Sequence, residues 1–146
     1  MIPVRRSGEP IMTTKPPPDV ERHTFSKEER LRGRLRVQEV VTTGRTVHEA
    51  PFKLTGKIMP LPAAVPAQIA FAVPKRNMPL AVHRNRMKRL MREAYRHNKH
   101  RFHAQLTTTG KQCAWLFIFR GKAPITLAET EMKITRALER WMQQHG

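Results

Sequence analysis

The chain has 146 residues, of which 39% are hydrophobic, and its 28 Lys and Arg against 11 Asp and Glu give a formal net charge of +17. Because so large a charge repels itself, the composition indicates a protein that works against a polyanion, with nucleic acid as the first candidate and an anionic membrane surface as the second. No run of about 18 apolar residues is present, which excludes a transmembrane helix on length.

The beginning of the chain is rich in proline and poor in large apolar side chains, with five prolines within residues 1–20. We therefore predict a disordered Pro-rich tail over residues 1–23 and a single folded domain over residues 24–146. The tail has no apolar core typical of a signal peptide, and Cys113 is the only cysteine, so we expect a cytoplasmic protein without an intrachain disulfide or a thiolate-rich zinc site.

The first half of the domain is predicted to contain one helix and two strands. Ser26 followed by Glu28 and Glu29 is typical of a helix start, and Gly44 is the expected end of that helix. Residues 52–59 alternate as in a strand, residues 61–67 form a proline-bounded loop, and residues 69–73 place Ile, Phe and Val on one face of a second strand.

The next segment, AVHRNRMKRLMREAYR at residues 81–96, predicts an amphipathic helix, with Pro79 in its first turn. At 100° per residue one side of this helix is apolar and the other is cationic, with Glu93 as its only acid. An ordinary solvated face mixes positive and negative side chains and gains (i, i+4) ion pairs of about 0.2–0.5 kcal/mol each. This face does not, so it indicates binding of a polyanion, which could be RNA or DNA. The guanidinium fork of arginine matches phosphate oxygens bidentately. The expected apolar side consists of Met87, Leu90, Met91, Ala94 and Tyr95.

The last part of the chain predicts a buried strand at residues 115–119, WLFIF, and a final helix that opens with a capping box of Thr126 and Glu129. The order of elements is typical of an α+β sandwich. The buried stripe of the final helix is expected to consist of Ile134, Leu138, Trp141 and Met142.

Arg84-Asn85-Arg86, followed by Lys88-Arg89 and Arg92-Glu93, resembles the RNR signature of the protein subunit of bacterial ribonuclease P. The similarity extends over residues 24–142. It includes Phe25-Ser26-Lys27, Arg30-Leu31, Gly44, the strand at residues 69–75 and Arg120. The resemblance implies an α+β fold of the ribosomal protein S5 domain 2-like type. That fold is a small two-layer α/β sandwich with a central, mostly antiparallel sheet and a left-handed βαβ crossover, an exception to the right-handed rule.

The resemblance also implies a ribonucleoprotein endoribonuclease that removes the 5′ leader of precursor tRNA, in which a catalytic RNA rather than this chain is catalytic. Mg²⁺ is then expected on that RNA and no cofactor or metal on the protein. The implied partners are the catalytic RNA and precursor tRNA without a membrane, and the protein is expected to be monomeric without RNA. The implied RNA-binding residues are Lys75, Arg76, Arg84, Asn85, Arg86, Lys88, Arg89, Arg92 and Arg96. The implied leader-binding residues are Val37, Val41, Phe52, Phe71 and Arg120.

The sequence departs from its relatives at the leader site. Val37 and Val41 stand where many members of the family carry aromatic residues that stack on leader nucleotides, and residues 77–80 replace a shorter glycine-containing connection. The two valines still form an apolar wall. Base stacking on aromatic rings at these positions, worth about 1–3 kcal/mol per base, is lost. Phe52 and Phe71 are candidates to replace that aromatic surface, although Phe71 could equally belong to the core.

The carboxylates and histidines bear on two other kinds of chemistry. A protein-only metal nuclease needs clustered carboxylates, whereas Asp19 is the only aspartate, it lies in the tail, and the glutamates are scattered. His97, His100 and His103 recur every third residue, which allows a metal site but is more typical of phosphate contacts near a helix end. The alternative functions are a structural RNA-binding protein such as a ribosomal component, and a DNA-binding helix, against which no helix precedes the basic one at helix-turn-helix spacing.

Overall fold

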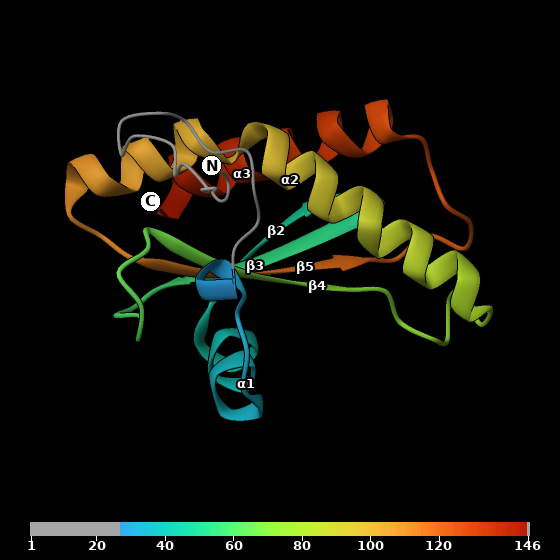
Figure 1. The fold of residues 1–146 in the computed structure, drawn as a ribbon, viewed down its shortest axis with the longest axis horizontal. Helices are drawn as coiled ribbons and strands as arrows, with labels where there is room; N and C mark the ends of the chain where they lie inside the picture. The colour runs from blue at the N-terminus through green and yellow to red at the C-terminus, as the bar shows by residue number, and fades with distance from the viewer. Residues whose placement is uncertain (1–26, 146) are drawn as a thin grey trace, which may run out of the picture.

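A computed structural model describes residues 27–145 (Figure 1), and the predicted tail, Phe25 and Ser26 lie outside these residues. The described elements are a 3₁₀ turn η1 (Lys27–Glu29), α1 (Arg34–Thr43), β2 (Arg45–Glu49), β3 (Phe52–Ile58), β4 (Ala67–Ala72), α2 (Ala81–Thr109), β5 (Cys113–Phe119) and α3 (Leu127–His145).

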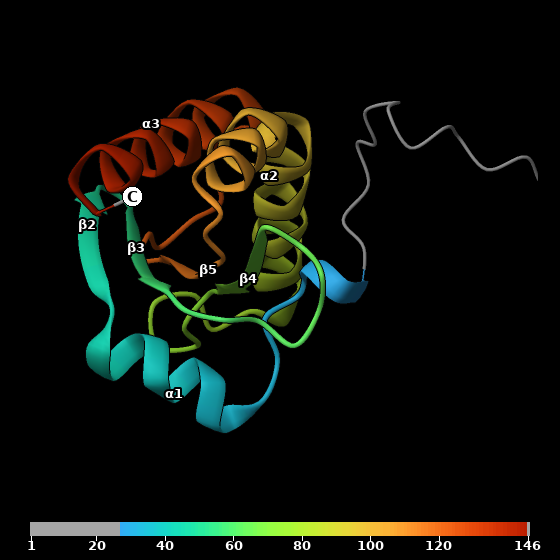
Figure 2. The ribbon, with the colours of Figure 1, turned by 90° about the vertical axis from the view of Figure 1, so that its left-hand side faces the viewer.

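The four strands form one sheet in the order β2-β3-β5-β4. The β2–β3 and β3–β5 pairs are antiparallel, whereas β4 and β5 are parallel and are joined through α2. The predicted α+β class with a mostly antiparallel sheet is therefore confirmed, and the left hand of the crossover stays a prediction. Helices α2 and α3 cover one face of the sheet and α1 lies on the other (Figure 2).

The main core lies between the sheet and the α2–α3 layer. Met87, Met91 and Tyr95 of α2 are fully buried, as the helical periodicity predicts. In β5, Trp115 packs edge-on against Trp141 of α3, with ring centroids 5.8 Å apart. Complete burial of each such large side chain contributes about 1.5–3 kcal/mol. A Cβ at Gly56 would lie only 2.4 Å from Trp115 Cδ1, so glycine is required where the two indoles meet β3.

The capping box and buried stripe of α3 are confirmed. The Glu129 backbone N–H donates to Thr126 Oγ1 at 3.1 Å, and the Thr126 backbone N–H donates to Glu129 Oε1 at 3.3 Å. Each residue thus satisfies an orphan amide of the helix start. The predicted stripe residues Ile134, Leu138, Trp141 and Met142 are all buried.

The start of the first helix differs from the prediction, since α1 begins at Arg34 and not near Ser26. The preceding residues are extended because Leu31 is buried and its backbone N–H donates to Ile69 O at 2.9 Å, so that residues 30–31 lie along the edge of β4. Gly33 then has a φ of 95°, a conformation that favours glycine, and the chain turns into α1. Gly44 caps the end of α1, as predicted.

Two further differences concern β2 and α2. Strand β2 was not predicted, because Val47 is its only buried apolar residue and its alternation is therefore weak. Helix α2 is longer than the basic segment and ends at Thr109, which places the three histidines inside it and not near its end. Leu80 is the N-cap, so Pro79 precedes the helix instead of occupying its first turn.

A buried ion pair joins η1 to α2. Lys99 Nζ donates to both carboxylate oxygens of Glu29 at 2.7 Å, and the two residues are only 4% and 7% exposed. His103 lies beside this pair, with Nδ1 3.8 Å from Glu29 Oε2, and its Nε2 is 2.7 Å from the Tyr95 hydroxyl oxygen. The network holds the segment before α1 against the middle of α2.

The stability of the fold is expected to fall as the pH falls from about 6.5 to about 4. Burial lowers the pKa of His103 from 6.5 to about 4, with the Lys99 charge acting in the same direction and the Glu29 charge opposing it. In this window the unfolded chain binds a proton that the folded chain does not, so stability decreases by at most about 1.4 kcal/mol per pH unit as pH falls. Urea unfolding of His103→Gln should show a flatter pH dependence than that of the wild type over this window, and equal slopes for the two proteins contradict the assignment.

Candidate nucleic-acid interface

The cationic side of α2 faces outward, as the periodicity predicts. Asn85, Arg86, Arg89 and Arg92 are exposed and Lys88 is half-buried. Within residues 27–145, none of these four cations forms an ion pair with an acid. The cationic face of α2, defined as Arg86, Lys88, Arg89 and Arg92, is thus available to an external anion.

Two of the predicted RNA-binding arginines are partly engaged within the protein. Arg84 Nη1 donates to the carbonyl oxygens of Met78 at 2.9 Å and Pro79 at 2.6 Å, which fixes the loop before α2. The Arg96 guanidinium pairs with the Glu93 carboxylate one turn earlier on the helix. These two residues therefore contribute to the local structure as well as to the positive field.

Other carboxylates pair with cations outside the cationic face of α2. Glu49 of β2 is surrounded by three cations of α3, with Lys133 Nζ at 3.8 Å, Arg136 Nη1 at 3.6 Å and Arg140 Nη1 at 3.0 Å. Glu139 pairs with Arg101 at 2.8 Å, near the far end of α2. The charge of α3 is thus compensated internally, and that of the cationic face of α2 is not.

Repulsion between neighbouring cations is visible at Arg92. Partial burial lowers the pKa of its guanidinium, and the positive charges of Arg30 and Arg89 lower it further. Arg30 belongs to the extended segment beside β4, so the positive field continues from α2 onto that segment. Several arginines in one region are suited to phosphate, because the guanidinium fork matches phosphate oxygens.

The loops at one end of the sheet add further cations. Because β4 and β5 are parallel neighbours, the residues that follow them leave the same end of the sheet. Lys75 and Arg76 follow β4 and Arg120 follows β5, and all three are exposed. Asn77 Nδ2 donates to Arg120 O at 3.4 Å and connects the two loops.

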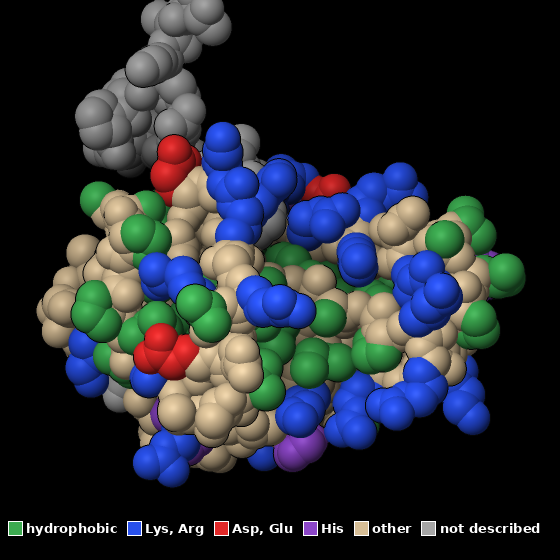
Figure 3. Space-filling view, turned by 90° about the horizontal axis from the view of Figure 1, so that it is seen from below, with side chains coloured by type: hydrophobic (Ala, Val, Ile, Leu, Met, Phe, Trp, Pro, Cys, Tyr) green, Lys and Arg blue, Asp and Glu red, His purple; other side chains and the backbone are tan. Residues whose placement is uncertain are grey.

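An apolar strip lies on the α1 side of the sheet and is bordered by Lys and Arg (Figure 3). Val37 packs on the small core of this face, and Val41 is 56% exposed. Ala72 of β4 and Ile118 of β5 are half-buried on the same face. We call the surface formed by Val37, Val41, Ala72 and Ile118 the α1 cleft.

The predicted placement of two aromatic residues in this cleft is wrong. Phe52 is 1% exposed and packs edge-on against Phe117, with ring centroids 6.2 Å apart, in the core under α2 and α3. Phe71 also lies on that side, stacked on Phe117 and edge-on to Tyr95. Both side chains point to the opposite face from α1, so neither replaces the aromatic surface lost at the two valines.

The histidines of α2 do not form a metal site. His97 Nδ1 lies 2.7 Å from Glu131 Oε2 of α3, whereas His103 is directed to Tyr95 and Glu29. Among the described residues, no three His, Cys, Asp or Glu side chains lie together as a metal site requires. The arrangement offers cations for binding and, over residues 27–145, no carboxylate cluster for metal-dependent hydrolysis.

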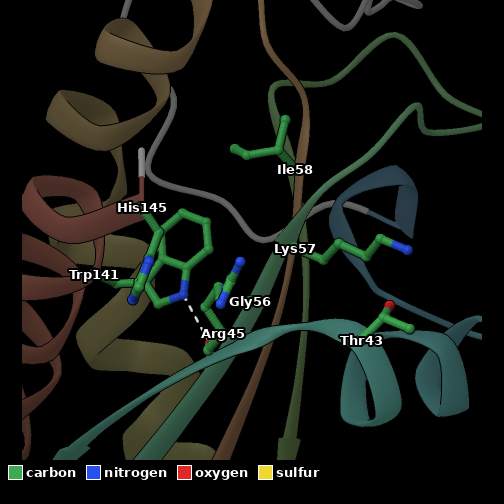
Figure 4. A pocket seen from close by; sticks show the side chains of 7 residues that line it. All are labelled: Thr43, Arg45, Gly56, Lys57, Ile58, Trp141 and His145. Atoms are coloured by element: carbon green, nitrogen blue, oxygen red, sulfur yellow. Dashed lines mark hydrogen bonds between the residues drawn. The ribbon is translucent and has the colours of Figure 1, made fainter.

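A different pocket, of about 380 Å³, lies where β2 and β3 meet the end of α3 (Figure 4). Lys57 extends away from Trp141 and His145 in this view and pairs with Glu39 Oε2 at 2.6 Å. Trp141 Nε1 donates to Arg45 O at 2.9 Å. The cations of this pocket do not converge, so it is a weaker candidate for a polyanion than the α2 side.

No helix in the described part of the chain is long and apolar enough to span a membrane. The fold and the surface together define a small α+β protein with a cationic helix and an adjacent apolar cleft. Residues 25–145 match the family model described as Ribonuclease P, and the chain belongs to the ribonuclease P protein family.

Individual relatives agree with this family. The chain is 69% identical over 32 residues to the ribonuclease P protein component of Chlorobium phaeobacteroides, covering 22% of each chain. It is 35% identical over 103 residues to that of Chlorobaculum tepidum, covering 68% of this chain and 58% of the relative. The chain thus spans less than two thirds of these relatives. The solved RNase P protein from Thermotoga maritima shares the fold, with a TM-score of 0.59 and 22% identity over 77% of this chain and 96% of that one.

Proposed function

We propose that this chain is the protein subunit of ribonuclease P, in which it binds a catalytic RNA and assists removal of the 5′ leader from precursor tRNA. The observation that carries the proposal is the uncompensated cationic face of α2 in a chain of this family. The RNA supplies the catalysis and holds the Mg²⁺, since the described part of the chain offers only binding groups. The proposal includes a cytoplasmic location and a monomeric protein in the absence of RNA.

The α1 cleft is the proposed path of the leader. Val37 and Val41 form one wall at (i, i+4) spacing, Ala72 and Ile118 form the floor, and Arg120 lies near the end of β5. An apolar strip between cations suits a single strand, whose bases contact the strip while its phosphates contact the rim. Lys75 and Arg76, in the loop between β4 and α2, add positive charge between this path and the cationic face of α2.

Reconstitution tests the proposed function. The full chain is mixed with catalytic RNA at low Mg²⁺, and cleavage of precursor tRNA is compared with that by the RNA alone. We expect the protein to raise the cleavage rate and to strengthen binding of precursors with a leader. If cleavage does not increase while the protein co-purifies with ribosomes, the chain is a structural RNA-binding protein instead.

Replacing Val41 by phenylalanine is expected to strengthen the binding of leader-containing precursor tRNA. Val41 is 56% exposed, so an aromatic ring fits there without disturbing the core, and one stacked base contributes about 1–3 kcal/mol. The gain should appear in the Kd of the reconstituted enzyme for a precursor with a leader and should be absent for mature tRNA.

Leu35→Phe provides the matched control for this substitution. Leu35 is also on α1, is 79% exposed, and lies six positions before Val41, on a different side of the helix. An equal gain for the two variants would show that the added ring binds RNA non-specifically and would count against the leader path.

A further inference from the structure

A basic pocket lies beside the cationic face of α2, where the extended residues before α1 run along β4. Its volume is about 420 Å³, and its lining includes Arg30, Arg32 and Arg92 together with Leu31 and Phe71. Strand β4 is the terminal strand of the sheet, so the pocket opens at the sheet edge and not in the α1 cleft. Three segments far apart in the sequence thus meet around one hollow.

The polar side of this pocket is suited to phosphate. All three arginines are exposed, and the positive charge of Arg30 lies close enough to Arg92 to lower the pKa of its guanidinium, after the larger effect of burial. Within the described residues, Arg32 donates one long bond to Lys27 O at 3.4 Å and forms no ion pair. Guanidinium forks such as those of Arg32 and Arg92 match phosphate oxygens in charge and shape, so this rim of the pocket suits phosphate.

The apolar side of the pocket is a fixed aromatic surface. The Phe71 ring is half-buried and is stacked on Phe117 at a centroid distance of 6.1 Å and an interplanar angle of 15°. The Tyr95 ring also packs against Phe71, with ring centroids 6.0 Å apart and an interplanar angle of 66°. Because Phe71 is only half-buried and its ring is already packed on one side, contact with a base costs little further side-chain entropy.

The position of the pocket depends on the buried ion pair described above. Glu29 immediately precedes Arg30, and its bidentate bond to Lys99 fixes the chain against α2. The backbone bond from Leu31 to Ile69 O fixes the next residue against β4. The backbone that carries Arg30 and Arg32 is therefore fixed beside α2 and β4 before any ligand binds.

We propose that this pocket binds one nucleotide of an RNA strand, with its phosphate on Arg32 and Arg92 and its base against Phe71. The inference rests on the proposed function in that RNA is the partner, and it adds a contact separate from the α1 cleft. The nucleotide belongs either to the catalytic RNA or to the leader of precursor tRNA, and the experiments below distinguish these sources.

The first experiment compares Arg32→Ala with Arg34→Ala in the full chain. Arg34 is an exposed arginine two positions away that does not line the pocket, so both variants lose the same charge. We expect Arg32→Ala to lower the salt slope of RNA binding by about one unit and to weaken binding about fivefold or more at low salt, and Arg34→Ala to do neither. Equal behaviour of the two variants would overturn the proposed pocket.

A second variant tests the base contact. Phe71→Leu keeps an apolar side chain in the core but removes the aromatic ring, so binding should weaken severalfold without a change in the salt slope. Unchanged affinity in a variant that remains folded by circular dichroism would contradict the base contact.

The source of the nucleotide is found by tethered cleavage. Glu28→Cys places a thiol just before the pocket arginines, and Cys113 is buried, so an iron–EDTA reagent labels only the new site. Cleavage of the catalytic RNA or of the leader supports the pocket and assigns its source, whereas no cleavage above a Met132→Cys control on α3 overturns it. If wild-type protein still stimulates precursor cleavage in that case, the pocket fails while the proposed function stands.

Discussion

Replacing Arg86, Arg89 and Arg92 together by alanine is expected to reduce the affinity for catalytic RNA by about two orders of magnitude or more at low salt and to lower the salt slope by about three units. Each of these exposed guanidinium groups is free of acidic partners within residues 27–145, so each can neutralise one phosphate and release its counterions. The measurement is Kd as a function of salt concentration, and precursor cleavage at low Mg²⁺ should fall in parallel.

The matched control replaces Arg34, Arg45 and Lys111 by alanine. These residues are exposed, lie outside the cationic face of α2, and carry the same total charge. Because a general effect of net charge would weaken both triple variants equally, similar losses would contradict a dedicated surface on α2. The α2 substitutions are on the solvent side, so the unfolding midpoint should remain close to that of the wild type.

Replacing Lys99 by alanine is expected to destabilise the fold by about 3–5 kcal/mol. The Glu29 carboxylate is 7% exposed and accepts two bonds of 2.7 Å from Lys99, so the substitution removes the cation that is paired with a buried charge. Urea unfolding followed by circular dichroism measures the loss.

Two further variants separate the buried pair from ordinary surface pairing. Arg101→Ala removes an ion pair to Glu139 whose side chains are about half exposed, and should cost no more than about 1 kcal/mol. The double variant Glu29→Leu/Lys99→Met removes both charges and should recover most of the stability lost in Lys99→Ala. A small loss in Lys99→Ala, comparable to that of Arg101→Ala, would show that water reaches Glu29.

Local periodicity was sufficient for the helices that carry the binding surface and the main core. In α2 the spacing of Met87, Met91 and Tyr95 predicts the buried side, and the cations on the other side are then exposed by geometry alone. In α3 the capping box and stripe are likewise short-range features, and the continuous apolar run of β5 is typical of a central strand. These features hold because each is specified by residues within a few turns of one another.

The predicted aromatic surface of the leader path failed for a different reason. Alternation in β3 indicates that Phe52 and Leu54 share one face, but it does not say which helix covers that face. The packing of α2 and α3 on that side buries Phe52, while α1 lies on the other side with the half-buried Ile118. The choice of face is a property of the assembled layers.

The net charge, the amphipathic α2 with its outward arginines, and the resemblance to the ribonuclease P protein family can all be read from the residues alone. The start of α1, the pairing of Glu29 with Lys99, and the pairing of Glu49 with cations of α3 rather than of α2 follow only from how the elements pack together. These contacts join residues that are far apart in the chain, and such pairs leave no periodic pattern. The net charge thus follows from the composition, whereas the ion pairs that compensate it depend on which segments fold side by side.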